Sequence, residues 1–172
     1  MTSLLKVDEI QDAAGKKILQ NTGSVLQVVQ AIKTDSASTT STSFTNAGIS
    51  ASITPTSSSS KILIQVNTVI GQSNFTKRVY LKLTGGNTAT YIGDAGTGVE
   101  AAVSVTTRVS ADSYGMVPTS MQYLDSPATT SAITYQVQWR VESDTGYINR
   151  PGTLDANGAN NASTITLTEI SA

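Results

Sequence analysis

Apolar and polar residues alternate with a period of two along several stretches of the chain. In the longest, residues 99–109, four valines occupy odd-numbered positions, while Glu100 and Arg108 occupy even-numbered ones. A helix cannot place alternate residues on one face, whereas a β-strand does so by construction. The pattern therefore predicts a strand over residues 99–109.

The same period recurs in residues 61–70, 77–83, 134–142 and 163–169. In the second of these runs it predicts that Arg78, Tyr80 and Lys82 point outward. The side chains predicted to point inward are Ile62, Ile64, Val66, Thr68, Ile70, Val79, Leu81, Leu83, Tyr135, Val137, Trp139, Val141, Ile165 and Leu167.

Three further runs, 24–33, 49–54 and 116–124, alternate less strictly. Pro118 interrupts the last of them, which favours an edge strand or a bulge because proline donates no ladder hydrogen bond. Turn-forming clusters separate the runs, and Gly85-Gly86-Asn87 is the strongest hairpin signal. About eight short strands without a long helical pattern predict an all-β fold, an antiparallel β-sandwich or jelly roll with a short N-terminal attachment segment.

The chain divides into three parts by composition. Residues 1–33 are expected to form an attachment and trimerisation segment, 34–43 a linker rich in Ser and Thr, and 44–172 the sandwich head. The first part is too short to bury its own apolar side chains, so we expect these to pack against sister chains or a docking protein. The candidate trimer or attachment residues are Leu4, Leu5, Val7 and Ile10.

Composition narrows the classes of function. The chain has no histidine and no cysteine, which removes the commonest general base, metal ligand and thiol nucleophile. With 13% charged residues and a net charge of −1, it has no basic field for nucleic acid. No stretch approaches the ~20 apolar residues of a membrane span. We expect no catalytic residue, no cofactor and no metal site, and hence no enzyme.

Weaker signals have plainer interpretations. Residues 93–98 resemble a phosphate-binding glycine loop but lack its lysine and precede a predicted strand. Glu142 and Asp144 could belong to a glycosidase pair, although nothing gives them different environments. The aspartates Asp94, Asp125, Asp144 and Asp155 are adjacent to turn residues, where turn capping explains them more simply than calcium binding.

Loop tyrosines are the candidate contact residues. Tyrosine supplies contact area with little loss of side-chain entropy, so it is common where proteins bind sugars or other proteins. Tyr114, Tyr147, Asn149 and Arg150 lie in segments rich in turn residues and are the candidate residues for contact with a sugar or protein, with ordinary packing on the domain as the alternative. Trp139 is expected in the core.

Several segments, in order along nearly the whole chain, resemble one family. They are residues 3–15 (SLLKVDEIQDAAG), 53–64, 123–128, 147–150 and 163–170 (STITLTEI). They are similar to small virion proteins of tailed phages, notably marine and cyanobacterial ones. The resemblance implies a homotrimer at the virion surface, attached by its N-terminus to another virion protein and carrying a β-sandwich head.

The resemblance leaves two kinds of virion protein open. A receptor-binding fibre would contact a host glycan or protein through its exposed loops. A capsid-decorating or cement protein would stabilise the head through the base of the trimer. A polysaccharide-degrading enzyme is a distant third alternative.

Overall fold

The computed structural model describes residues 13, 22–86, 105–108, 112–154 and 160–172. These residues form ten strands and no helix, so none of them belongs to a helix that could cross a membrane. The strands are β1 (Val25–Lys33), β2 (Ala37–Thr39), β3 (Thr45–Ile53), β4 (Lys61–Gln72), β5 (Val79–Thr84), β6 (Val105–Thr107), β7 (Met116–Asp125), β8 (Ile133–Val141), β9 (Gly146–Ile148) and β10 (Ser163–Ile170).

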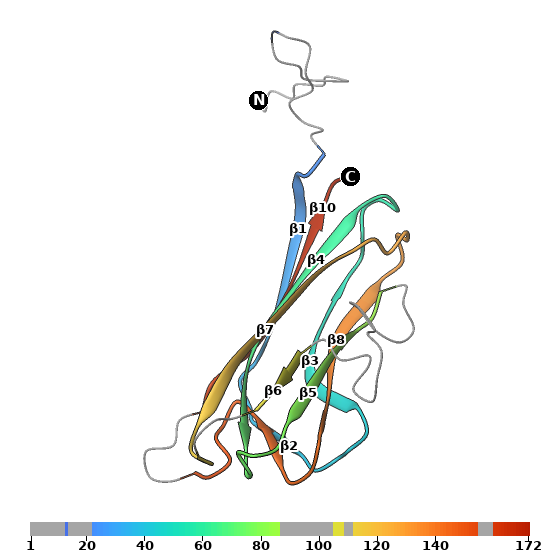
Figure 1. The fold of residues 1–172 in the computed structure, drawn as a ribbon. Coiled ribbons are helices and arrows are strands. Elements are labelled where there is room, and N and C mark those ends of the chain that lie inside the picture. The colour runs from blue at the N-terminus through green and yellow to red at the C-terminus, as the bar shows by residue number, and fades with distance from the viewer. Residues whose placement is uncertain (1–12, 14–21, 87–104, 109–111, 155–159) are drawn as a thin grey trace.

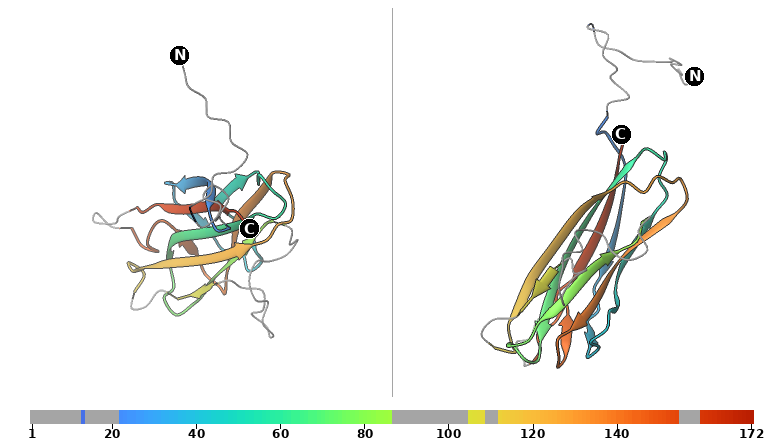
Figure 2. Two further views of the ribbon diagram at one scale, coloured as in Figure 1. Left: turned by 90° about the horizontal axis from the view of Figure 1, so that it is seen from above. Right: turned by 45° about the vertical axis from the view of Figure 1, so that its right-hand side comes forward.

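The strands form two antiparallel sheets packed as an elongated sandwich (Figure 1). In the six-stranded sheet the order is β1-β10-β4-β9-β2, and β7 pairs with the other edge of β4. The second sheet has the order β3-β8-β5-β6. Figure 2 shows the strands running along the length of the molecule. The predicted all-β antiparallel sandwich is confirmed.

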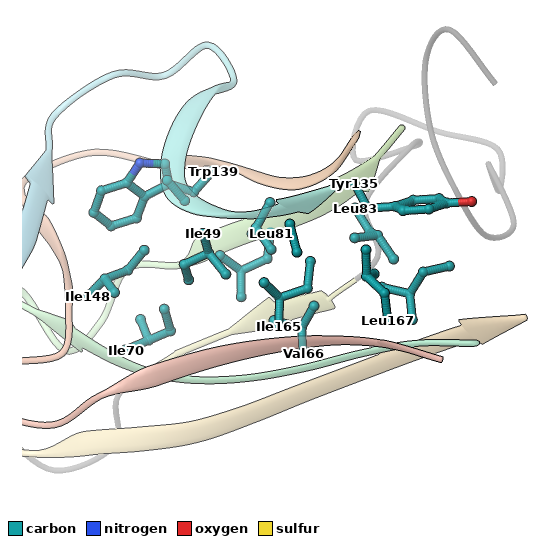
Figure 3. Close-up of a cluster of buried hydrophobic side chains, with 14 of the residues drawn as sticks. Ile49, Val66, Ile70, Leu81, Leu83, Tyr135, Trp139, Ile148, Ile165 and Leu167 are labelled. Atoms are coloured by element: carbon teal, nitrogen blue, oxygen red, sulfur yellow. The ribbon is translucent and has the colours of Figure 1, made fainter. Parts of the chain in front are cut away.

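The core lies between the two sheets, where the alternating positions predicted it. All of the side chains predicted to point inward are at most 2% exposed. Figure 3 shows Ile165 and Leu167 of one sheet facing Leu81, Leu83 and Tyr135 of the other. Trp139, 2% exposed, lies in this core as expected. The alternation thus fixed which face of each strand is buried.

Tyr80 lies on the outer face of β5, as predicted, but it is buried there rather than exposed. Its side chain is only 1% exposed. The guanidinium carbon of Arg140, from the neighbouring strand β8, lies 3.9 Å from the centre of the Tyr80 ring. On the same sheet, the Lys82 ammonium lies 4.7 Å from the centre of the Phe44 ring. Long basic side chains therefore cover aromatic rings on this outer face.

Strand β7 is an edge strand, as Pro118 predicted. Among the described residues it pairs with β4 alone, where Pro118 lies opposite Val69. An edge position accommodates a residue that has no backbone N–H to donate.

The sandwich begins earlier in the chain than residue 44, where its start was predicted. β1 pairs with β10 along nearly its whole length, and β2, within the expected linker, pairs with β9. The sandwich therefore begins at Val25 and includes part of both spans assigned to attachment and linker, because their backbone hydrogen bonds complete the sheet. Leu4, Leu5, Val7 and Ile10 lie outside the described residues, as do the predicted hairpin residue Asn87 and most of the run 99–109.

Candidate functional site: the loops at the distal end

The chain enters and leaves the sandwich at one end. The backbone N–H of Gly23 donates to the carbonyl of Ser171, and the N–H of Ser171 donates to the carbonyl of Ser24. We call this the proximal end and the opposite one the distal end (Figure 1). The distal end carries the connections that follow β1, β4, β8 and β9 and the turn that precedes β7. Every candidate host-contact residue belongs to a segment at or next to this end.

Tyr114 projects from a fixed turn. The backbone N–H groups of Tyr114 and Gly115 both donate to Oδ1 of Asp112, at 3.0 and 2.9 Å. Aspartate commonly stabilises turns in this way. The Tyr114 side chain is 54% exposed. The turn thus presents an aromatic ring to solvent on an ordered backbone.

Two hydrogen bonds join this turn to the segment that follows β9. The N–H of Thr153 donates to the carbonyl of Ser113 at 2.8 Å, and their side-chain hydroxyls lie 2.7 Å apart. The turn that carries Tyr114 and the segment that carries Arg150 are therefore adjacent, although about forty residues separate them in the chain.

A second pair of distal loops is joined in the same manner. The N–H of Ser73 donates to the carbonyl of Thr145 at 2.9 Å, and the N–H of Thr145 donates to Oγ of Ser73 at 3.1 Å. Asn74 adds a 3.2 Å hydrogen bond from Nδ2 to Oδ2 of Asp144. The loops after β4 and β8 therefore hold each other in place.

Gly71 and Gly152 bring the segment after β9 directly against the end of β4. A Cβ atom at Gly71 would collide with the backbone of Arg150 and Pro151, and one at Gly152 would collide with the backbone of Gln72. Only glycine permits this close approach of two backbones. The distal loops consequently rest on the sheet itself.

Glu142 binds two basic residues beside these loops. Its carboxylate oxygens lie 3.3 Å from Nζ of Lys77 and 3.2 Å from Nη1 of Arg78. The hydrogen bond from Lys77 and the two positive charges hold the pKa of Glu142 below its ordinary value. Because the side chains are partly exposed, water screens these ion pairs.

Tyr147 lies in a strand rather than in a loop. It is the central residue of β9, opposite Ser38 of β2 on one side and Gly71 of β4 on the other. Its ring is half-buried, and the guanidinium carbon of Arg150 lies 4.1 Å from the ring centre. The two candidates are therefore stacked on each other, which orients the guanidinium at the distal end.

Asn149 cannot contact a host molecule, since its side chain is fully buried. Nδ2 donates to the carbonyls of Lys33 and Asp35 at 2.9 and 3.0 Å, and Oδ1 accepts a 2.6 Å hydrogen bond from Ser163. Its backbone has a φ of 64°, a conformation that asparagine tolerates better than most residues. Asn149 is a structural residue, and its place among the candidate contacts is corrected.

Two exposed apolar residues of the distal loops were missed by the sequence reasoning. Phe75 is 43% exposed in the loop after β4, and Leu154 is 47% exposed next to Thr153. Each is an isolated large apolar residue within a polar, turn-rich segment, which is the signal that could have identified it. With Tyr114, they give the described part of the distal loops three exposed large apolar side chains.

The described residues contain no group of three or more acidic residues placed to hold a metal ion. Glu142, one member of the weakly predicted carboxylate pair, binds Lys77 and Arg78, and Asp144 accepts hydrogen bonds from Asn74 and Ser143. The partners of both carboxylates thus belong to the loop structure.

Comparison with known proteins yields structural neighbours only. No family model and no curated protein matches the chain. Two solved structures align with 98% of it: one of the infectious bursal disease virus Gx strain, at 10% identity and a TM-score of 0.35, and the VP2 subviral particle of that virus, at 14% and 0.33. The chain spans 44% and 42% of those two chains. TM-scores this low do not establish a shared fold.

Proposed function

We propose that this protein is a multi-copy surface component of a tailed-phage particle that binds the host surface through its distal loops. In this proposal it is a homotrimer attached to another virion protein by its N-terminal segment. It acts by binding a host glycan or protein, without turnover. The sequence resemblance to small phage virion proteins and the all-β sandwich support this reading.

One observation carries the binding proposal: the distal loops present exposed apolar side chains from an ordered backbone. Tyr114, Phe75 and Leu154 are each more than two-fifths exposed. The loops around them are fixed by hydrogen bonds between loops. A surface that is ordered before binding loses little conformational entropy when a partner binds. Aromatic side chains at such a surface supply large contact areas.

The distal loops also lie at the end opposite to the proposed point of attachment, which supports them as the binding surface. The chain enters the sandwich at the proximal end, so an N-terminal attachment leaves the distal loops directed away from the particle. Three copies held side by side would present three such surfaces to one cell. Linked sites increase the overall affinity far beyond that of one weak site.

The location of the protein on the particle is tested by immunogold labelling of intact virions. Label confined to the tail is the result expected of a host-binding fibre. Label spread over the head would instead make the protein a capsid-decorating component and overturn host binding by the distal loops. Absence of label from purified particles would overturn the virion assignment itself.

The binding surface is tested with the full-length protein on host cells and on immobilised surface glycans. Tyr114→Ala should weaken binding at least tenfold, the loss of roughly 1.4 kcal/mol or more that a central aromatic contact supplies. Tyr123→Ala is the matched control, because Tyr123 is 40% exposed but lies on β7 near the proximal end. Equal binding by the two variants would exclude Tyr114 from the contact.

A further inference from the structure

A row with three aliphatic side chains and one threonine crosses the outer face of the six-stranded sheet near the proximal end. Val28 of β1 lies opposite Thr168 of β10, Thr168 lies opposite Leu63 of β4, and Leu63 lies opposite Leu124 of β7. Val28 is 59% exposed and Leu124 45% exposed. No described segment covers this row, although burying aliphatic side chains is favourable.

The next row toward the distal end is polar but uncharged. It consists of Gln30, Thr166, Gln65 and Gln122, and Nε2 of Gln30 donates to Oγ1 of Thr166 at 3.0 Å. Among the outward-facing side chains of β1, β10, β4 and β7, Lys61 alone is charged. We call the outer surface of these four strands the uncharged face.

The outer surface of the other sheet is different. It carries the charged side chains of Lys82 and Arg140, and Arg78 and Glu142 form an ion pair beside them. Surfaces that remain in water normally carry interspersed charges of both signs. The sandwich therefore has one face suited to water and another that lacks the charges water-exposed sheets usually carry.

Strand β1 shows the same feature at its edge. Among the described residues β1 pairs with β10 alone, and Lys33 is the one charged residue among its nine. Its exposed apolar residues are Val25, Leu26, Val28 and Ile32, between 46% and 60% exposed. Proteins usually protect long edge strands with charge or proline, and β1 has neither in its first eight residues.

The lack of charge on this face favours another copy of the same chain as its binding partner. Around a symmetry axis, identical chains bring each residue close to its own copies, so a surface without charge suits contacts that lie along such an axis. An acidic or basic partner would be matched by charges of opposite sign, which the uncharged face lacks. β1, one of the four strands of this face, begins at the proximal end, where the chain enters the sandwich.

We propose that the uncharged face is the surface on which copies of this chain pack against one another, with the strands running along the symmetry axis. This arrangement gathers the N-terminal segments of all copies at one end and leaves the distal loops at the other. The number three rests on the proposed function, whereas the contact itself does not.

The test is the mass of the full-length protein by light scattering and sedimentation equilibrium. Val28→Lys combined with Leu124→Lys places several like charges in the contact, where they repel one another across the interface. The dissociation constant of the assembly should rise about 100-fold or more. Both positions are already solvent-exposed in one chain, so the variant should melt as the wild type monomer does.

Ser50→Lys combined with Thr54→Lys is the matched control, because it adds the same charge to two exposed positions of the other sheet's side, Ser50 in β3 and Thr54 directly after it. This control should assemble as the wild type does. A wild-type chain that is monomeric at tens of micromolar, or a Val28 and Leu124 variant that assembles normally, overturns the proposal. Loss of assembly in the control as well as in the variant also overturns it, since charge at any site would then act alike.

The N-terminal segment is tested separately with Leu5→Asp combined with Val7→Asp. If this variant alone becomes monomeric while the face variant assembles, the N-terminal segment is the assembly element and the uncharged face is not. If both variants weaken assembly, the face and the segment act together. These measurements follow assembly and not host binding. A result that overturns packing through the uncharged face therefore leaves the proposed host binding untouched, and the reverse also holds.

Discussion

The phenol of Tyr135 donates a 2.6 Å hydrogen bond to Oδ2 of Asp125, and both residues are buried. The bond joins the end of β7 to the start of β8 across the proximal connection between them. The other carboxylate oxygen of Asp125 accepts a hydrogen bond from the N–H of Ser126. Burial raises the pKa of the Tyr135 phenol above its ordinary value, and the bond to Asp125 raises it further.

Tyr135→Phe should lower the free energy of unfolding by about 1.5–3 kcal/mol, because a buried carboxylate loses a charge-assisted hydrogen bond. Urea denaturation followed by tryptophan fluorescence measures the change. Tyr123→Phe removes a hydroxyl from a partly exposed ring and should stay within about 0.5 kcal/mol of the wild type. Similar stability of Tyr135→Phe and wild type would show that Asp125 does not depend on this bond.

Glu169 is a second buried carboxylate, on an inward position of β10. Oε2 accepts a 2.6 Å hydrogen bond from Gln27, and Oε1 accepts two of 2.7 Å from the backbone N–H and the hydroxyl of Thr56. Burial alone would raise the pKa of this carboxyl, but these hydrogen bonds to the ionised form lower it from 4.5 to about 2.

The contribution of Glu169 to the free energy of unfolding should therefore depend on pH. The folded-state pKa lies below the unfolded one, so the contribution is complete above pH 4.5 and is lost as the pH falls toward 2. Glu169→Gln, which has no charge to protonate, should show a shallower fall in unfolding free energy over that range. Denaturant titrations at several pH values measure both slopes.

Glu142→Gln is the control for the acid dependence. The pKa of Glu142 is also lowered, but its ion pairs are partly exposed, so its removal should change the slope much less. Parallel pH profiles for Glu169→Gln and the wild type would refute the assigned role of Glu169.

Trp139→Ala should lower the free energy of unfolding by about 3–5 kcal/mol, since the indole is 2% exposed in the core between the sheets. Thermal melting followed by circular dichroism measures the loss. Phe75→Ala, a truncation of a ring that is 43% exposed, is the comparison and should change stability little. An unchanged melting curve for Trp139→Ala would contradict the strand register of β8.

The buried face of each strand was predictable because side-chain direction follows from the backbone period alone. What covers an outward side chain was not predictable, as Tyr80 shows: its cover, Arg140, comes from a strand sixty residues later. Glu169 is the converse case, a charged residue on an inward position. Its partners Gln27 and Thr56 are more than one hundred residues away in the sequence.

The candidate site also contains one residue with local partners and one whose partners are distant in the sequence. Tyr114 was a candidate because its segment is rich in turn residues, and the turn is indeed local, since Asp112 two residues earlier stabilises it. The role of Asn149 depends on Lys33 and Asp35, more than 110 residues away, and no local pattern encodes that contact. The short strands β2 and β9 escaped prediction because three residues are too few to show a period.

Asn149 gives the last prediction, because two separate effects meet at this residue. Its side chain bonds the connection after β1 and the start of β10, and its φ of 64° disfavours most other residues. Asn149→Gly should lower the unfolding free energy by about 2–4 kcal/mol, since buried carbonyls and a hydroxyl lose their partner. Asn149→Ala should lose roughly a further 1 kcal/mol, because alanine adds the backbone strain that glycine avoids.

Urea denaturation of both variants separates the two effects, and host-cell binding under native conditions separates structure from recognition. If the folded Asn149→Gly protein binds as the wild type does, the residue acts on the fold alone, as its burial requires. Lost binding at full stability would contradict the buried position of Asn149 and restore it to the contact surface. Equal stability of the glycine and alanine variants would show that the positive φ adds no measurable strain.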